Sequence, residues 1–330
     1  MNATARSSLP GGSAGALIFR LRAVPVSAWP FVAFVALFLI GGILRPSLFS
    51  LDSLWSTAAF AMILAIVSSG QTLAVISGGI DLSVPNTLTI SALAYLSAAP
   101  TLGAVGALVL AICVGLAIGT FNGVGISLMG INPIVMTIAT NGLVFGILLL
   151  HFDLAQLGNA PGLLTAITSA KIELLGTRIP AVIPVGLGLV LALQGLLLGT
   201  GFGRMIYLLG GSQESARLAG VPVWQVRIAV YALAGALAAF GGLVVAGYFN
   251  QVSVGMGDSY LLGSVAAVVV GGASIFGGTG SMMGTLGGAL VLSQTSTLVA
   301  IADLGVSTQQ ILYGLIIVAV VAVYGREGRR

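Results

Sequence analysis

Long uninterrupted runs of apolar residues recur along this chain from Trp29 to Tyr324. Runs of this kind reach about 20 residues, the length at which a helix crosses the roughly 30 Å hydrocarbon layer of a membrane. Only 6% of the residues are charged, whereas an ordinary soluble domain has about 25%. The runs lack the two-residue alternation of a membrane β-barrel strand. The sequence therefore predicts an all-α polytopic membrane protein.

The breaks between these runs predict about ten transmembrane helices. We place them near residues 30–44, 56–77, 86–99, 102–121, 132–150, 180–199, 228–248, 260–276, 282–300 and 309–324. The third helix is short and ends at Pro100, so it is compatible with either a full crossing or a re-entrant segment. An even number of crossings places both termini on one side of the membrane.

The basic residues indicate which side is the cytoplasm. Nine fall on the side of the termini and three on the other, and cytoplasmic loops are enriched in Lys and Arg. The first group is Arg6, Arg20, Arg22, Arg204, Arg217, Arg227, Arg326, Arg329 and Arg330, and the second is Arg45, Lys171 and Arg178. We therefore expect cytoplasmic tails at 1–28 and 326–330. Between them, 29–325 would form one transmembrane domain with a cytoplasmic loop at 201–227. Because residues 1–28 lack a strong apolar stretch followed by an A-x-A site, we expect a retained tail.

The sequence carries no recognisable catalytic constellation. Its single cysteine, Cys113, lies in an apolar run and is expected to be a small buried side chain. Its single histidine, His151, is expected to be solvated at a membrane edge, and the single lysine, Lys171, does not belong to a phosphate-binding loop. We therefore expect no catalytic residue, no metal site and no cofactor bound by this chain. The net charge of +4 reflects topology and does not indicate nucleic-acid binding.

The cytoplasmic stretch LLGGSQESARLAGVPVWQVR, residues 208–227, predicts a short helix. Ser212 is placed to cap it, and Glu214 lies in its first turn, where the helix dipole favours an anion. Gly220 is placed to end it in the left-handed conformation, and Pro222 forbids continuation. A helix this short is marginal alone, so we expect it to dock. Its docking groups are Glu214, Ala216, Arg217, Ala219 and Gly220. A connector packed within the subunit is the alternative.

The stretch VISGGIDLSVPNTL, residues 75–88, places a carboxylate and a glycine pair in an apolar region. Gly78 and Gly79 loosen the chain, and Pro85 suits the first turn of the next helix, with Asp81 and Ser83 near its start. Ionisable residues inside membranes are commonly functional, although one near the interface also fits a structural turn. Both interpretations remain open. The later stretch VVGGASIFGG, 269–278, echoes this one and hints at an internal duplication.

Candidate groups for a polar solute path are few. A cavity for a hydroxylated solute needs hydrogen-bonding groups and aromatic faces. The candidates are Asn141, Tyr248, Asn250 and Gln251. Single polar residues in a bundle also form ordinary interhelical hydrogen bonds, which is the alternative. Asn122 and Asn132 are expected to be caps at turns. Most paired glycines are expected to serve close helix packing.

Four stretches resemble the permeases of ribose-type ATP-binding cassette (ABC) sugar importers, which are also related to branched-chain amino acid permeases. They are SGGIDLSV (77–84), FNGVGISLMGINPIVMTIATNGLVFGI (121–147), LGGSQESARLAGVPV (209–223) and VVVGGASIFGGTGSMMGTLGGALV (268–291). Their order and spacing extend the resemblance over most of the chain from about residue 55 onward. The chain departs from the family at Pro85, where glycine is usual, and at residues 212–215, where Asn-x-x-Ala is commoner.

This resemblance implies a ten-helix permease in the cytoplasmic (inner) membrane, paired with a second copy or a paralogue. It implies ABC ATPase subunits, which would hold ATP and Mg²⁺, and a soluble substrate-binding protein outside. Residues 210–222 would couple to the ATPase through Ser212, Glu214, Ala216, Arg217 and Gly220. Residues 77–83, with Gly78, Gly79, Asp81 and Ser83, would form a turn that holds the gate geometry.

The implied cargo is a monosaccharide. Another small polar solute, such as a nucleoside, an autoinducer or a branched-chain amino acid, is the nearest alternative. A secondary transporter usually needs a charged ion-coupling residue near mid-membrane, and the predicted helices carry none in their middle. A structural scaffold would explain the glycines but not the capped cytoplasmic helix.

Overall fold

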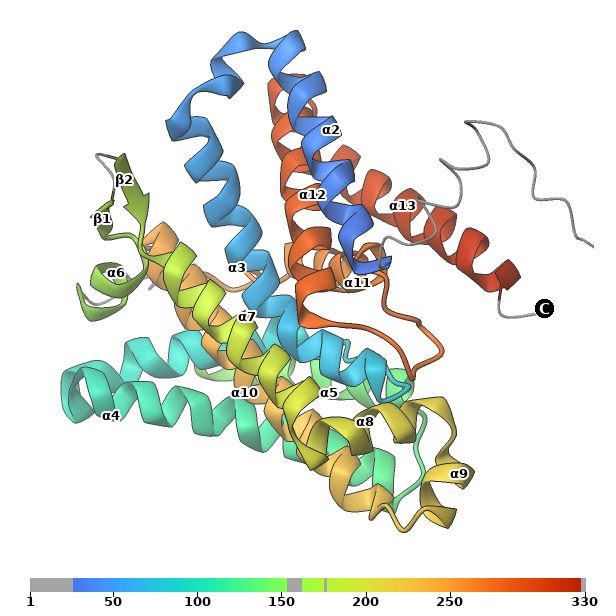
Figure 1. Cartoon of the computed structure of the whole chain (residues 1–330). Coiled ribbons are helices and arrows are strands. Elements are labelled where there is room, and N and C mark those ends of the chain that lie inside the picture. Colours follow the sequence, from blue (N-terminus) through green and yellow to red (C-terminus); the bar gives the residue numbers. More distant parts are fainter. Residues whose placement is uncertain (1–25, 153–161, 175–176, 328–330) are drawn as a thin grey trace, which may run out of the picture.

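The computed structural model describes residues 26–152, 162–174 and 177–327, and helices make up most of them. The long helices are α2 (Trp29–Leu44), α3 (Leu51–Ile76), α4 (Val84–Leu128), α5 (Pro133–His151), α7 (Val182–Gly199), α10 (Val223–Phe249), α12 (Met282–Ile301) and α13 (Val306–Glu327). The short ones are η1 (Val26–Ala28), η2 (Pro46–Phe49), α6 (Gly162–Thr168), α8 (Gly201–Gly211), α9 (Gln213–Leu218) and α11 (Ser259–Val270). Strands β1 (Lys171–Leu174) and β2 (Thr177–Pro180) form an antiparallel hairpin. The predicted all-α membrane architecture is confirmed (Figure 1).

Helix α4 contains two of the predicted transmembrane segments. It holds Pro100, and the backbone of Gly103 is not helical, with φ 69° and ψ 170°. Only glycine adopts that conformation without strain, so the chain turns back on itself here, as the doubled arm of α4 shows in Figure 1. With α4 divided at this bend, nine of the ten predicted segments are helical over nearly their whole length. The predicted segment 260–276 is helical only as far as Val270, because α11 ends there at Gly271.

Helix α3 lies at the centre of the molecule, and its side chains are buried without interruption from Ala61 to Ile76. Helix α10 packs against both α3 and α4. At its contact with α4, a Cβ on Gly235 would overlap the carbonyl oxygen of Gly115, and a Cβ on Gly119 would overlap that of Tyr231. Small residues allow helix backbones to approach closely in a membrane, so these glycines are required by packing.

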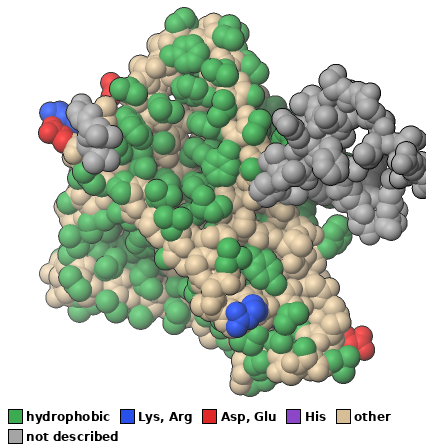
Figure 2. Space-filling view, viewed as in Figure 1, with side chains coloured by type: hydrophobic (Ala, Val, Ile, Leu, Met, Phe, Trp, Pro, Cys, Tyr) green, Lys and Arg blue, Asp and Glu red, His purple; other side chains and the backbone are tan. Residues whose placement is uncertain are grey.

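Charged side chains on the face shown in Figure 2 gather at two ends of the molecule, over the β1–β2 hairpin and over α8 and α9. Between these ends the surface is apolar or uncharged. The hairpin contains Lys171 and Arg178, which the charge bias assigns to the outside, and α8 and α9 contain Arg204 and Arg217, which it assigns to the cytoplasm. The two ends are well separated in Figure 1, as the predicted topology requires.

Two predictions about α4 are wrong. The helix does not end at Asn122 but continues to Leu128, so Asn122 is a buried residue within a helix and not a cap. Glycines do not stop the helix here because α10 packs directly on them, with the Cα of Ile228 only 2.7 Å from a Cβ built on Gly123. Cys113 is exposed rather than buried, since a side chain in an apolar membrane helix can face lipid instead of the protein interior.

Two regions contain more regular structure than the sequence predicted. The segment 201–227, predicted as a loop, contains helices α8 and α9 and the first turn of α10. The polar segment after α5 contains α6 and the β1–β2 hairpin, where Glu173 pairs with Arg178 across the strands. The predicted tail at 1–28 lies almost wholly outside the described residues. At the other end, α13 extends to Glu327, beyond the predicted boundary at 325.

Candidate functional site

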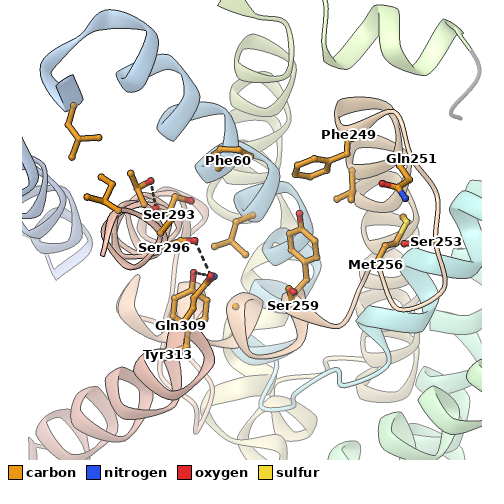
Figure 3. A pocket seen from close by; sticks show the side chains of 18 of the residues that line it. Phe60, Phe249, Gln251, Ser253, Met256, Ser259, Ser293, Ser296, Gln309 and Tyr313 are labelled. Atoms are coloured by element: carbon orange, nitrogen blue, oxygen red, sulfur yellow. Dashed lines mark hydrogen bonds between the residues drawn. The ribbon is translucent and has the colours of Figure 1, made fainter. Parts of the chain in front are cut away.

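A cavity of about 800 Å³ opens between the ends of α3, α10 and α12 that the topology assigns to the outside. One wall is the α10–α11 connection, with Gln251, Ser253 and Met256, and the facing wall is formed by α12 and α13 (Figure 3). Polar side chains line both walls. They are Gln251, Ser253, Ser259, Tyr260, Ser293, Ser296, Thr297, Gln309 and Tyr313. The cavity can therefore offer many neutral donors and acceptors to a small solute.

A chain of hydrogen bonds fixes the α12–α13 wall. The Ser296 hydroxyl donates to Oε1 of Gln309 at 3.0 Å, and Nε2 of Gln309 donates to the Tyr313 hydroxyl at 2.9 Å (Figure 3). The Tyr313 hydroxyl then donates to the carbonyl of Leu292 at 3.1 Å. This wall is therefore held in one arrangement by α12 and α13 together. Among the described lining residues, Arg45 carries the one charge, and the other polar side chains of the lining are neutral.

Aromatic side chains close the α3–α10 side of the cavity. Phe60 and Phe249 lie in the wall, with ring centroids 6.1 Å apart and nearly parallel planes. Tyr248 packs edge-on against both, at 5.9 Å from Phe60 and 5.4 Å from Phe249. Flat apolar faces beside hydrogen-bonding groups are what a cyclic hydroxylated solute needs, because its two kinds of surface are then both matched.

The structure brings some of the candidate path residues together and leaves others apart. Gln251 lies in the cavity wall, and Tyr248 lies behind it in the aromatic cluster. Asn250 adopts the left-handed conformation, with φ 51°, and ends α10, so it is a cap at the rim. Asn141 lies on α5, outside the cavity lining. Its backbone carbonyl oxygen accepts a hydrogen bond from Nδ2 of Asn86 at 3.1 Å. Asn132 is the N-cap of α5, as predicted.

The loop at 77–83 is held by residues that lie far from it in the sequence. Nδ2 of Asn122, on α4, donates to the Ser83 hydroxyl at 2.9 Å. Oγ1 of Thr137, on α5, accepts from the amide of Leu82 at 3.0 Å. Gly79 lies against α10, because a Cβ there would overlap the hydroxyl of Tyr231. The loop is thus a fixed turn among α4, α5 and α10.

Asp81 is the one charged side chain buried within the described chain, with 1% of its surface exposed. Its Oδ1 accepts from the Ser83 hydroxyl at 2.6 Å and from the Ser83 amide at 2.9 Å. Burial raises the pKa of Asp81 above its ordinary value, although these hydrogen bonds oppose the rise. Helix α4 begins at Val84 with no side-chain cap. Asp81 therefore bonds the residue before the helix and does not cap it.

Replacing Asp81 with asparagine tests the role of this charge. Asparagine keeps the oxygen that accepts both hydrogen bonds from Ser83, so we expect the fold to survive within about 1 kcal/mol. We expect assembly or coupling to be impaired more than the choice of solute, because Asp81 lies in the turn and not in the cavity lining. Uptake per complex, assembly and solute competition should be measured together. Normal coupled uptake with an unchanged solute preference would contradict this role.

The loops after α3 and α11 share one backbone geometry. After α3, the backbone amides of Ser77, Gly78 and Gly79 donate to the backbone carbonyls of Leu73, Val75 and Ala74, respectively. After α11, the backbone amides of Gly271, Gly272 and Ala273 donate in the same pattern to the carbonyls of Ala267, Val269 and Val268. The glycines at equivalent positions, Gly78 and Gly272, have φ of 88° and 86°. Each is the left-handed glycine of a Schellman-type helix end. The two loops therefore share this part of the backbone geometry, although the glycine pairs of the sequence echo are offset by one residue in it, and the internal duplication stays a prediction.

These two loops meet each other and the end of α8. The amide of Gly278 donates to the carbonyl of Ile76 at 2.9 Å. A Cβ on Gly210, at the end of α8, would overlap that same carbonyl oxygen. A Cβ on Gly277 would lie 2.6 Å from the carbonyl oxygen of Gly210 and 2.9 Å from the Cα of Gly78. We call Gly78, Gly210, Gly277 and Gly278 the glycine junction. It joins three backbones with no side chain between them.

Tyr207 fastens α8 to the second loop one turn before the junction. Its hydroxyl donates to the carbonyl of Gly280 at 2.8 Å. Burial raises the pKa of Tyr207 above its ordinary value, so this hydroxyl remains protonated and remains a donor at neutral pH. A movement of α8 is therefore transmitted to the loop at 271–281 through a hydrogen bond as well as through backbone contact.

Helix α9 follows α8 directly and is the short helix predicted within residues 208–227. The Ser212 hydroxyl accepts from the Ser215 amide at 3.2 Å, and Gly220 ends the helix with φ 77°. Ala216 is fully buried and anchors α9 to the rest of the chain, whereas Glu214 and Arg217 are exposed. Leu218 is 85% exposed. An anchored helix that presents charged groups and a bare leucine has the form of a docking element.

Several residues of the site were not found from the sequence. Phe202, Met205, Ile206 and Leu209 recur at the spacing of an amphipathic helix, which would have predicted α8. The serines of α12 and Gln309 of α13 carry no local signal, since hydroxyls and amides in membrane helices more often bond their own bundle.

Comparison of the sequence with known proteins matches this chain to one family. Residues 53–321 match the family described as branched-chain amino acid transport system / permease component. The ribose import permease protein of Haemophilus influenzae is 30% identical over 297 residues, which cover 88% of this chain and 90% of that protein. The autoinducer 2 import system permease protein of Yersinia pseudotuberculosis serotype O:3 is 30% identical over 300 residues, covering 89% of this chain and 83% of the relative.

Proposed function

Because the chain belongs to the family of the branched-chain amino acid transport system permease components, we propose that it forms the solute path of an ATP-driven importer. In this proposal a separate ATPase subunit binds α9 and holds ATP and Mg²⁺. A soluble binding protein delivers the solute at the outer cavity, and the path is completed by a second copy or a paralogue. The chain itself is a multi-pass transport subunit, and we place it in the inner membrane.

The observation that carries the proposal is α9 together with the glycine junction. Helix α9 presents Glu214, Arg217 and Leu218 to the solvent. It is joined through Ser212 to α8, whose end at Gly210 touches both loops. A displacement of α9 by a partner in the cytoplasm would therefore be transmitted through α8 to the two loops that follow α3 and α11. Rigid helices that rock about a few loop residues are a common basis of switching.

A monosaccharide is the proposed cargo. The cavity offers neutral hydroxyls and amides beside aromatic faces, and one relative is named for ribose import. Autoinducer 2, named for another relative, is the second candidate, and a nucleoside would also find partners there. A branched-chain amino acid is less well matched, because its apolar side chain would leave these polar groups unpaired.

Uptake by the reconstituted complex tests the proposal. The chain, its ATPase and its binding protein would be placed in proteoliposomes, and uptake of radiolabelled D-ribose, autoinducer 2, adenosine and leucine would be compared. We expect uptake of a hydroxylated solute that requires ATP and the binding protein. Uptake that proceeds without ATP and follows an ion gradient would instead identify a secondary transporter, with buried Asp81 as its natural ion-coupling group.

A further inference from the structure

One face of α3 connects the outer cavity with the loops at the glycine junction. Phe60, Leu64, Ser68, Gln71 and Val75 recur every three or four residues, so they lie in one stripe along the helix. Phe60 and Leu64 line the cavity. At the other end Val75 packs in an apolar cluster with Val268 and Ala273, against which Ile80 also lies. The stripe therefore begins at the cavity and ends at an apolar plug between the two loops.

The middle of this stripe is polar, buried and unpaired. Ser68 and Gln71 are both 0% exposed. Within the described chain, no group makes a hydrogen bond to the Ser68 hydroxyl or to either polar atom of the Gln71 amide. Leaving a buried polar group unpaired costs roughly 1–3 kcal/mol. Seven residues of helix rise about 10 Å, so Gln71 lies that far beyond Leu64 along the path.

Helix α11 runs beside the stripe and supplies no side-chain partner for Gln71. Gly263 lies opposite Leu64, since a Cβ there would be 3.4 Å from the Leu64 side chain. Five residues further along α11, Val268 packs against Val75. Between these contacts α11 contributes Ala266 and Ala267, which are small and apolar, while the Ser264 hydroxyl donates to the carbonyl of Leu261 in its own helix.

We propose that Ser68 and Gln71 form an inner binding step for a neutral, polyhydroxylated solute, between the outer cavity and the apolar plug. This inference rests on the proposed transport function. An amide donates and accepts, and a hydroxyl does both, so together they match neighbouring hydroxyls of a sugar. The described stripe carries no charge, and it therefore has nothing to neutralise an ionic cargo. The solute would form hydrogen bonds with the Ser68 hydroxyl and the Gln71 amide as it leaves the outer cavity.

The test compares Gln71→Leu with Gln294→Leu. Gln294 is a matched control, because it is also 0% exposed with both amide atoms unpaired. It lies on α12 against α2 instead, with Nε2 3.1 Å from a Cβ built on Gly41. In proteoliposomes, the amounts of D-ribose imported and of ATP hydrolysed would be measured together. If ribose is not carried, the measurement would use whichever of autoinducer 2, adenosine and leucine shows the highest uptake.

We expect Gln71→Leu to lower the solute imported per ATP hydrolysed roughly fivefold to tenfold, the factor that a lost hydrogen bond supplies. Gln294→Leu should leave this ratio unchanged. A purely structural defect lowers uptake and ATP hydrolysis together, so an unchanged ratio in Gln71→Leu would overturn the inner step. If the unaltered complex shows no ATP-driven uptake, the proposed function fails before this comparison is reached.

Cysteine labelling keeps the inference testable if Gln71→Leu does not fold. In a Cys113→Ala background, which removes the single native cysteine, Ser68→Cys and Leu73→Cys would be treated with a positively charged, membrane-impermeant methanethiosulfonate during ATP turnover. Leu73 is also fully buried on α3 but lies on another face. We expect labelling at residue 68, slowed by the cargo, and none at 73. Equal labelling at both positions, or none at 68, would overturn the proposal.

Discussion

Replacing Gly210 with alanine is expected to abolish ATP-driven uptake, whereas the same change at Gly211 is expected to leave it intact. The added methyl group at Gly210 would overlap the carbonyl oxygen of Ile76, which is backbone and cannot rotate away. Overpacking commonly costs about 1–3 kcal/mol, and here it would also break the hydrogen bond from Gly278 to Ile76. Gly211 is the next residue of α8, and a Cβ there meets nothing within 4 Å.

Uptake and ATP hydrolysis of the two variants should be compared with the fraction of each that remains folded in detergent. We expect Gly211→Ala to match the unaltered chain in all three, because alanine is also the better helix former. A milder variant, Tyr207→Phe, removes only the hydrogen bond to Gly280 and should lower uptake while the chain stays folded. Uptake by Gly210→Ala equal to that of Gly211→Ala would show that α8 does not act through the glycine junction.

The exposed groups of α9 are expected to be essential for binding the ATPase and unimportant for folding. In Glu214→Ala/Arg217→Ala/Leu218→Ala, all three truncated side chains are exposed, so the free energy of unfolding should change by no more than about 0.5 kcal/mol per site. Interface anchors of this kind commonly contribute 2 kcal/mol or more. We therefore expect copurification of the ATPase to fall by at least about tenfold.

A matched change at the other end of the molecule controls for general effects. Leu304 is 50% exposed and follows α12, on the side assigned to the outside, so Leu304→Ala should leave ATPase binding unchanged. Thermal unfolding of both variants would show whether the fold is intact. Full retention of the ATPase by the triple variant would mean that α9 is a connector packed within the subunit, the alternative that the sequence left open.

Most of the fold could be predicted because membrane helices follow from local composition. The bend in α4 was marked by Pro100, and the turn of α9 by Ser212 and Gly220. The errors arose where contacts between helices override local signals. The end of α4 was placed too early at Asn122, because α10 packs on the following glycines and keeps the helix intact.

The site was harder to predict than the fold. Gln251 was selected as a polar residue beside aromatics and does lie in the cavity wall, but Gln309 and Ser296 are more than 40 residues further along the chain. Gln71 gave no signal in the sequence, since its importance depends on the absence of a partner from the other described helices. A buried polar group without a hydrogen-bond partner can be recognised only when the positions of the surrounding helices are known.

Purification of the tagged chain from its native membrane in mild detergent, with partners identified by mass spectrometry, tests the central claim most directly. We predict that an ABC ATPase will be present in the eluate of the unaltered chain and lost from that of the α9 triple variant. Absence of any ATPase, under conditions in which a known ABC complex stays assembled, would contradict the claim and favour a self-sufficient secondary transporter.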